Sequence, residues 1–291
     1  MNQERKNILV LGASGGVGGM VLRGLQDTHQ FNLTGTYFQH QKNGLIYCDI
    51  RNPENVNKVI ESSSPSAIIN FSGLAQEKLC QDKPELAYET NVMGTENLIK
   101  AASKYSIPLL YPGTINELSG YQDGTICTED TKPLAKDTSI YGKTKIIARQ
   151  KVLERCTSPT AIPVTDLVLG SGFGFVALGE NNGYFRIRID ATRFPIYIED
   201  YLKYIQLFIR DPQKYNGVYH LFSEDFQQGI LLSDLAKKVT TRFALASEYQ
   251  VIEGATEFKP RDNVKAPIPI YIDADAKKLA TENRVFTSTR H

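Results

Sequence analysis

Two side chains near the middle of the chain are suited to proton transfer. Tyr141 and Lys145 occur in the run YGKTK, at the start of a predicted helix that continues to about Arg155. Residues four apart share one face of a helix, so the phenol and the ammonium would be neighbours. A nearby positive charge stabilises the phenolate and lowers the pKa of the tyrosine toward neutrality. The pair therefore predicts a general acid or base, although many helices carry such a pair on their surface without catalytic function.

Of two further polar residues, Thr114 falls where a reactive group could lie, and Asn91 lies within a helix. Thr114 follows a predicted strand at residues 107–111, and ligands of open α/β sheets bind outside the carboxyl ends of the strands. Asn91 lies inside a predicted helix at 85–104. Each residue also has a purely structural interpretation, because Thr114 suits a helix or turn cap and Asn91 suits an exposed helix position.

The N-terminal stretch has the pattern of a dinucleotide-binding turn. An apolar run of strand type at 8–11 ends in the spacing G-x-x-G-x-x-G, and an apolar helical pattern follows. Glycine lets a pyrophosphate approach the backbone, and a helix N-terminus offers free N–H groups and a partial positive charge. The residues predicted to form this turn are Gly12, Ser14, Gly15, Gly16, Val17 and Gly18. The alternative is a tight strand-to-helix turn without a ligand.

Predicted strands and helices alternate through the first half of the chain. Further strands are predicted at 31–38, 44–50, 67–71 and 107–111, and helices at 53–62, 85–104 and 141–155. We therefore expect an α/β fold with a Rossmann-type, doubly wound parallel sheet and a small C-terminal α/β substrate-binding portion. The expected domains are 1–170 for the dinucleotide and 171–291 for the substrate, with some later elements returning to the first domain.

The end of the second predicted strand bears on the choice of cofactor. In NAD-binding folds an acidic residue often stands there and holds the ribose 2′-hydroxyl. Here Tyr37 and Phe38 follow instead, with His40 and Lys42 just beyond. A missing acid with cations nearby suits the extra phosphate of NADP, so NADP is predicted and NAD stays an alternative. His40 and Lys42 could equally be solvated loop residues.

The composition is that of an ordinary soluble protein, 41% hydrophobic and 22% charged with a net charge of +1. This balance favours neither nucleic acid nor an anionic membrane as a partner. No apolar run is long enough to span a bilayer and no secretory signal is recognised, so a cytoplasmic protein is expected. The scattered cysteines and histidines form no ligand pattern, and no metal is predicted.

Together these motifs resemble those of the extended short-chain dehydrogenase/reductases. The similarity rests on GASGGVG at 12–18, NFSG at 70–73, TNVMGTENLIKAA at 90–102 and YGKTK at 141–145. Within that superfamily the chain is most similar to the dTDP-4-dehydrorhamnose reductase group. Two later runs, RFPIYIEDY at 193–201 and KPRDNVKAPIPIYIDADAKKL at 259–279, resemble segments of that group less specifically.

The resemblance implies roles for individual positions. In the family a tyrosine protonates a carbonyl while nicotinamide delivers hydride, a lysine holds the nicotinamide ribose, a threonine or serine binds the substrate oxygen, and an asparagine supports a relay water. The implied catalytic residues are Tyr141, Lys145, Thr114 and Asn91. Besides the glycine turn, Tyr141 and Lys145, the implied cofactor contacts are Tyr37, His40, Asp49, Ile50, Phe71, Ser72 and Gly73. Among these, Asp49 would bind the adenine amine.

Departures from the family concern the substrate more than the redox chemistry. The segment between Asn182 and Pro195 is short, where relatives place a helix that helps to hold the nucleotide. The family's STDYVF run reads GTINEL at 113–118, and Val168 replaces an arginine. Candidate substrate residues are Asn182, Arg186 and Arg188, and the two arginines could clamp a phosphate or form a solvated strand face.

The sequence therefore predicts an NADP-dependent reductase acting on a keto group of a sugar or nucleotide sugar. One alternative is a non-catalytic, cofactor-binding regulatory subunit, similar to the methionine adenosyltransferase beta subunit. Another is an epimerase on the same scaffold, whereas Ile115 and Asn116 stand where dehydratases commonly carry an acidic pair. A small-molecule keto substrate is the expected partner, and the resemblance is compatible with a homodimer.

Overall fold

A computed structural model describes residues 4–122, 125, 127–137, 139–172, 186–187, 192–243 and 250–251. The chain divides into two compact units that interleave along the sequence. The first unit comprises Met1–Gly120, Lys132–Val164 and Leu202–Tyr219, and the second comprises Tyr121–Thr131, Thr165–Tyr201 and His220–His291. The domains expected from the sequence, 1–170 and 171–291, stay a prediction.

An eight-stranded sheet dominates the first unit, in the order β12-β7-β5-β4-β1-β2-β3 with β6 paired to β7. Every neighbouring pair from β3 to β7 is parallel. The strands are β1 (Lys6–Leu11), β2 (Phe31–Tyr37), β3 (Leu45–Tyr47), β4 (Ala67–Asn70), β5 (Leu109–Leu110), β6 (Gly113–Thr114), β7 (Thr160–Thr165) and β12 (Gly217–His220). The order reverses direction beside β1, as in doubly wound folds, which confirms the predicted fold class.

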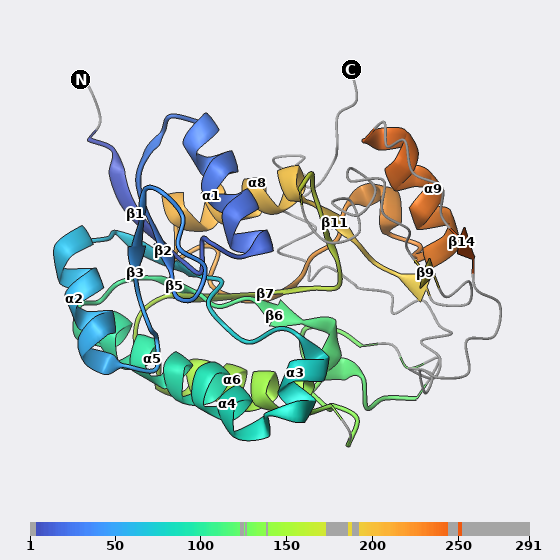
Figure 1. The fold of residues 1–291 in the computed structure, drawn as a ribbon, viewed down its shortest axis with the longest axis horizontal. Coiled ribbons are helices and arrows are strands. Elements are labelled where there is room, and N and C mark those ends of the chain that lie inside the picture. The colour runs from blue at the N-terminus through green and yellow to red at the C-terminus, as the bar shows by residue number, and fades with distance from the viewer. Residues whose placement is uncertain are drawn as a thin grey trace. The chain divides into compact units, whose positions relative to one another are not determined.

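Helices cover both faces of this sheet (Figure 1). On one face lie α1 (Gly16–Asp27) and α8 (Ile198–Arg210), and on the other α2 (Pro53–Ser63), α5 (Gly94–Lys104) and α6 (Ile140–Arg155), with α3 (Glu77–Asp82) and α4 (Pro84–Tyr88) beside α6. Apolar residues of α2, α5 and α6 form one buried core with the strands. Because both faces are covered, the strands read as continuous apolar runs, as in Ile8–Leu11.

The helix predicted at 85–104 is interrupted by a π-helical turn. The structure has α4, then the π turn η1 (Glu89–Met93), then α5, without a break in the chain path. A π turn inserts one extra residue per turn and often marks a functional position. Its consequence here is that Asn91 is buried, with 4% of its surface exposed, and not on the helix surface.

The second unit is built from short paired strands, the 3-10 turn η3 (Glu224–Phe226) and the helix α9 (Leu232–Arg242). The strand pairs are β8 (Val168–Leu169) with β11 (Ile196–Tyr197), β10 (Thr192–Arg193) with β13 (Ile230–Leu231), and β9 (Arg186–Ile187) with β14 (Gln250–Val251). Its core gathers Leu169, Tyr197, Phe226, Leu235 and Val239. A helix predicted at about 275–281 lies outside the described residues.

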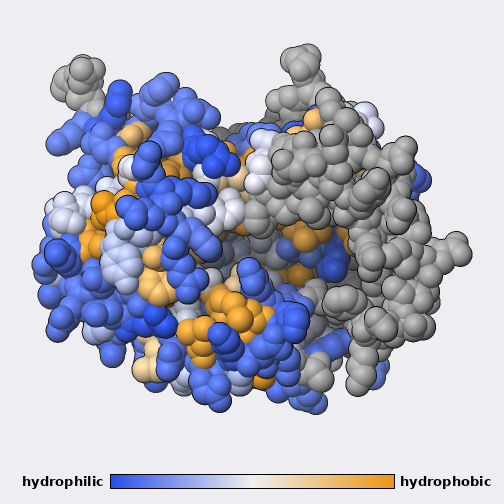
Figure 2. Space-filling model, viewed as in Figure 1, coloured by the Kyte–Doolittle hydropathy of each residue, from blue (hydrophilic) through white to orange (hydrophobic). Residues whose placement is uncertain are grey.

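The described surface carries mainly polar residues, with apolar side chains in small patches on the face shown in Figure 2. Such patches are usual on folded proteins. Among the helices that the structure describes, none combines the length and the apolar character needed to cross a membrane.

Candidate active site

The glycine-rich turn between β1 and α1 packs too closely for any side chain at two positions. Gly12 has a φ of +73°, and a Cβ there would lie 2.5 Å from the carbonyl carbon of Phe71. A Cβ at Gly18 would overlap the carbonyl oxygen of Gly12. The N–H of Gly15 donates to that same oxygen at 3.0 Å and closes the turn. Gly12 and Gly18 are therefore required by the backbone itself.

The start of α1 is open to an anion. Gly15 is the N-cap, and in this described segment no side chain caps the helix and no acidic residue lies in its first turn. A Cβ at the exposed Gly15 would meet only the Gly12 carbonyl oxygen, at 3.3 Å. Ser14, Gly16 and Val17 are half-buried around this position. The first N–H groups of α1 can therefore bind a phosphate.

Thr36 of β2 holds the turn in place, and the sequence analysis missed it. Its buried Oγ1 accepts the N–H of Gly12 at 3.1 Å, and its carbonyl accepts the N–H of Ser14 at 3.2 Å. The available signal was a hydroxyl next to Gly35 in β2, a strand that also contains Asn32 and Thr34. That signal does not reveal a partner 24 residues earlier in the chain.

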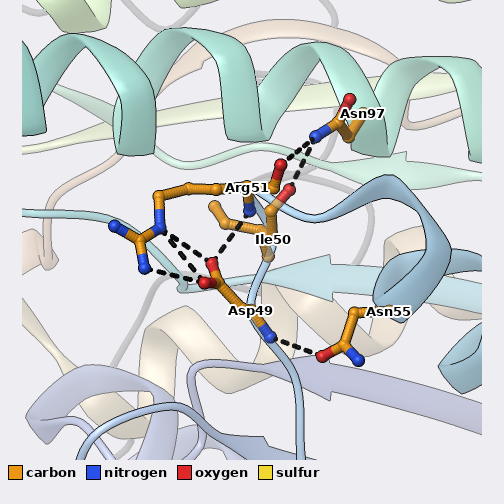
Figure 3. Close-up of polar contacts among 5 residues, drawn as sticks. All are labelled: Asp49, Ile50, Arg51, Asn55 and Asn97. Atoms are coloured by element: carbon orange, nitrogen blue, oxygen red, sulfur yellow. Dashed lines mark hydrogen bonds and ion pairs between the residues drawn. The ribbon is translucent and has the colours of Figure 1, made fainter.

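Asp49 and Ile50, two of the predicted cofactor contacts, follow β3 and lie beside Arg51 (Figure 3). The Asp49 carboxylate accepts from Arg51 Nε at 2.9 Å and NH2 at 2.7 Å. Hydrogen bonding by Arg51 lowers the pKa of Asp49 below its usual range. The Arg51 guanidinium lies 4.9 Å from the centre of the Phe38 ring. The predicted adenine-binding carboxylate is thus already paired with an arginine that the sequence analysis did not single out.

The same segment is anchored from two helices. Asn97 of α5 donates to the carbonyls of Ile50 and Arg51 at 2.9 and 3.0 Å (Figure 3). Asn55 of α2 accepts the N–H of Asp49 at 3.0 Å. Ile50 itself is buried. These contacts hold the Asp49–Arg51 turn at the edge of the sheet, where the side chains of Asp49 and Arg51 are partly exposed.

The end of β2 presents an aromatic residue where NAD-binding folds often carry an acid. The Tyr37 ring packs edge-on against Tyr47, with centroids 5.8 Å apart. His40 and Lys42 are exposed. A cavity of about 220 Å³ lies between α1 and the loop after β2, and both Arg23 and Lys42 line it. Two cations therefore border this cavity.

The chain after β4 connects the glycine turn to the helix layer. Phe71 and Ser72 pack on Gly12, and Ser72 donates both its N–H and its hydroxyl to Asn70 Oδ1. A Cβ at Gly73 would lie 3.2 Å from Asn91 Oδ1. The predicted residues at this strand end are therefore in contact with both the glycine turn and the π turn.

Thr114 and Tyr141 are in direct contact. Thr114 is buried at the end of β6 and caps the 3-10 turn η2 (Ile115–Leu118), as its structural interpretation predicts, while its role at a reactive centre stays a prediction. Tyr141 lies in the first turn of α6, whose N-cap Ser139 accepts the N–H of Gly142. Burial raises the pKa of Tyr141 to about 12, while a hydrogen bond with Thr114 lowers it. Tyr141 is therefore a protonated phenol at neutral pH.

Lys145 does not lower the pKa of Tyr141 as expected, and that expectation is wrong in this structure. Its Nζ donates to the Pro112 carbonyl at 2.7 Å and lies 3.9 Å from the centre of the Tyr111 ring. Burial lowers the pKa of Lys145 to about 8. One helical turn does bring the two residues to the same face of α6, but the ammonium is directed to the backbone after β5 and not to the phenol.

Asn91 is a buried connector. Its Oδ1 accepts the N–H of Leu74 at 2.7 Å, and its Nδ2 donates to the Leu74 carbonyl and to Thr144 Oγ1, both at 3.0 Å. Thr144 in turn donates to the Tyr141 carbonyl at 2.9 Å. Asn91 therefore joins the chain after β4 to the helix that carries Tyr141.

A buried ion pair, Glu117–Arg149, lies beside these residues and the sequence analysis did not single it out. The contact joins Glu117 Oε2 and Arg149 NH1 at 2.9 Å. Glu117 also accepts the N–H of Thr114. The sequence signal was weak, because a glutamate in a turn and an arginine in a helix are usually solvated.

The predicted substrate residues fall mostly beyond what the structure describes. Asn182 and Arg188 lie outside the described residues, and of Arg186 only the backbone in β9 is described. Among the described residues, no group of three or more histidine, cysteine or acidic side chains could hold a metal ion.

The parallel sheet order, the glycine turn and the Tyr–Lys helix define the class of extended short-chain dehydrogenase/reductases. More specifically, the chain belongs to the family described as RmlD substrate binding domain, which matches residues 6–285. A dTDP-4-dehydrorhamnose reductase of Aggregatibacter actinomycetemcomitans is 25% identical over 257 residues, or 82% of this chain and 83% of the relative. The resemblance predicted from the sequence is thereby confirmed.

Two other comparisons bear on fold and function. A crystal structure of dTDP-4-dehydrorhamnose reductase from Bacillus anthracis str. Ames in complex with NADP has a TM-score of 0.71 at 19% identity, covering 86% of this chain and 85% of that chain. Methionine adenosyltransferase 2 subunit beta of Rattus norvegicus is 24% identical over 155 residues, or 53% of this chain and 45% of that relative. The first likeness shows the fold, and the second relative is named as a subunit of an enzyme.

Proposed function

We propose that this protein is an NADP-dependent reductase that transfers hydride to a keto group of a sugar or nucleotide sugar. The observation that carries the proposal is the packing of β6, which ends in Thr114, against α6, which has Tyr141 in its first turn, so that the two side chains interact. A phenol hydrogen-bonded to a second hydroxyl is the arrangement needed to bind and protonate a carbonyl oxygen. The similarity to a dTDP-4-dehydrorhamnose reductase over most of both chains supports the same chemistry.

The first unit fits a dinucleotide. The turn around Gly12 and Gly15 leaves backbone N–H groups open at the start of α1, and a side chain at Gly12 would collide with Phe71. Contacts run without interruption from Gly12 through Ser72 and Gly73 to Asn91. Residues proposed to hold the nucleotide are Gly12, Ser14, Gly15, Gly16, Val17, Gly18, Tyr37, His40, Asp49, Ile50, Phe71, Ser72, Gly73, Tyr141 and Lys145. When bound, the cofactor supplies the hydride.

The chain's own residues supply the proton and hold the substrate. Thr114 hydrogen-bonds the carbonyl oxygen together with Tyr141, and the phenol gives its proton to that oxygen as negative charge develops there. Because burial keeps Tyr141 protonated well above neutral pH, the acid form is present throughout the physiological range. Lys145, bound to the Pro112 carbonyl, is placed to bind a ribose hydroxyl with its remaining N–H groups.

The preference for NADP rests on the surroundings of β2. Tyr37 takes the position of the acid that would repel a 2′-phosphate, and Arg23 and Lys42 border the neighbouring cavity. We infer that these cations attract the phosphate. Calorimetric titration should give a lower Kd for NADPH than for NADH, and equal Kd values would contradict the inference.

The function is tested by NADPH oxidation over a panel of keto sugars and nucleotide keto sugars. A substrate-dependent loss of absorbance at the nicotinamide band supports the reductase. Binding of NADPH without turnover on any substrate favours the regulatory subunit, an alternative that the similarity to methionine adenosyltransferase 2 subunit beta keeps open. Mass spectrometry of material that co-purifies with the protein would then identify its ligand.

A further inference from the structure

The Glu117–Arg149 ion pair lies in the interior, where charges are expensive. The two side chains are 0% and 4% exposed, and their charged atoms are 2.9 Å apart. Moving two charged groups out of water costs free energy that offsets much of their mutual attraction. Replacing a buried ion pair by apolar residues of similar volume is therefore often neutral or stabilising. Stability alone therefore does not explain the pair, and its contacts indicate another role.

Glu117 fixes the backbone on which Thr114 stands. Its Oε1 accepts the N–H of Thr114 at 3.2 Å, and Thr114 Oγ1 accepts the N–H of Asn116 at 3.4 Å. This reciprocal capping box holds both the backbone and the hydroxyl of Thr114. The hydroxyl oxygen that interacts with Tyr141 is thus also held by the N–H of Asn116.

Arg149 links the helix of Tyr141, the second residue of the proposed catalytic contact, to Glu117. Tyr141, Lys145 and Arg149 are spaced by four residues along α6 and so lie on one face of the helix. Arg149 NH1 binds Glu117, whereas its buried Nε has no hydrogen-bond partner in the described part of the chain. The ion pair therefore joins η2, the turn that Thr114 caps, to α6, the helix that contains Tyr141.

We propose that Glu117 and Arg149 are positioning residues that hold Thr114 against Tyr141 for proton transfer. Glu117 is fully buried, and its hydrogen bond to this pair of hydroxyl residues goes to the backbone N–H of Thr114. This inference rests on the proposed reductase function for its kinetic consequences. Its structural consequence, the setting of the Thr114–Tyr141 contact, can be measured without turnover.

The pair also sets the electrostatics of the site. The ionisable groups around Tyr141 are Glu117 from η2, Cys80 from α3, Tyr111 after β5 and Lys145 on α6 itself. The negative charge of Glu117 raises the pKa of both Tyr141 and Lys145. Neutralising Glu117 should therefore lower both pKa values, and the alkaline limb of a pH–rate profile should move to lower pH.

Two variants separate positioning from stability. Glu117→Gln keeps an oxygen for the Thr114 N–H and removes the charge, whereas Glu117→Leu/Arg149→Met replaces the pair by apolar side chains. Arg149→Lys keeps the positive charge and serves as the conservative rescue. Glu96→Gln is the control, because it breaks ion pairs to Lys151 and Arg155 of the same helix, at 3.2 and 2.5 Å, away from Tyr141.

The double variant should unfold near the wild-type midpoint and bind NADPH with the wild-type Kd, yet lose about 10- to 100-fold in kcat with KM little changed, because misplaced catalytic groups cost that order. Glu117→Gln should lose less, with its alkaline limb lowered by roughly one unit. Arg149→Lys should recover most of the rate, and Glu96→Gln should match wild type. Wild-type kcat in a folded double variant would overturn the proposal.

A second measurement tests the positioning role of Glu117 even if no substrate is turned over. Protein labelled with 13C at tyrosine Cζ reports each phenol, and Tyr141→Phe assigns the Tyr141 resonance by its disappearance. The midpoint of that resonance should fall in Glu117→Gln and in the double variant, and stay unchanged in Glu96→Gln. An unchanged midpoint in both Glu117 variants refutes the positioning role, independently of whether the protein is a reductase.

Discussion

At the scale of single residues, the phenol of Tyr141 is the group on which the proposed chemistry depends. Tyr141→Phe removes only the hydroxyl and keeps the ring and the other proposed cofactor contacts, so the variant should still bind NADPH, with a calorimetric Kd close to the wild-type value. Turnover of a carbonyl substrate should fall by about 10²- to 10⁴-fold, the usual contribution of a general acid. Full activity in this variant would mean that the proton comes from another group.

Lys145 has a charge that is lost in an accessible pH range. Its pKa is lowered to about 8 by burial, so the ammonium is present below pH 8 and disappears above it. If Lys145 holds the cofactor, the Kd for NADPH should rise between pH 7 and pH 9. Lys145→Met should bind more weakly at pH 7 and lose this pH dependence, and the neighbouring Lys143→Met serves as control. A wild-type Kd that is flat over this range would exclude the contact.

Local spacing made some site residues predictable and left others hidden. Tyr141 and Lys145 follow from one helical repeat, and Thr114 from its position after a strand. Glu117 and Arg149 are 32 residues apart in sequence, and their contact depends on how η2 packs against α6. The direction of the Lys145 ammonium was mispredicted for the same reason, because the carbonyl of Pro112 comes from another element.

At the scale of elements, the glycine turn offers a separable test of cofactor binding. Gly15 is exposed and a Cβ there meets one atom at 3.3 Å, so Gly15→Val should fold while its side chain blocks the approach of a pyrophosphate. NADPH binding should be lost by calorimetry, with circular dichroism and the unfolding midpoint near wild type. A normal Kd would show that no phosphate lies at this turn.

Gly18 needs a different expectation from Gly15. In the sequence the two glycines are equivalent members of one G-x-x-G-x-x-G pattern. In the structure a Cβ at Gly18 overlaps the Gly12 carbonyl, so Gly18→Val would displace the turn itself and lower the unfolding midpoint. The contact between the helix and the turn that decides this cannot be read from a pattern of glycines.

The regular elements were the most predictable part of the fold. Buried strands such as Ile8–Leu11 and helices such as α2, with its Asn52 cap and Pro53, carry strong local signals. The π turn at Glu89–Met93 was not predicted, because a helical repeat does not reveal an extra residue in one turn. That turn is what buries Asn91 and joins it to Thr144.

At the scale of the whole molecule, segments of the two units alternate along the chain. The unit to which each segment belongs cannot be predicted from the order of the segments in the sequence. The segment Leu202–Tyr219 returns to the first unit and supplies most of α8 and of β12. Its apolar helix face packs under α1, where Leu202 occupies the space beside Gly24. A long-range return of this kind depends on which surfaces complement each other in three dimensions.

All residues proposed to hold the dinucleotide belong to the first unit, so ligand binding should stabilise that unit in particular. NADPH at 100 times its Kd adds about 2.7 kcal/mol to the free energy of unfolding, provided that the unfolded chain does not bind it. At about 2–4 °C for each kcal/mol, the midpoint should rise by roughly 5–10 °C in scanning calorimetry. NADH at the same concentration should raise it less, because the 2′-phosphate contacts are missing. Gly15→Val should show no rise, whereas Tyr141→Phe should keep it. If the two units melt separately, only the transition of the first unit should move, and an equal shift of both transitions would contradict a binding site confined to the first unit.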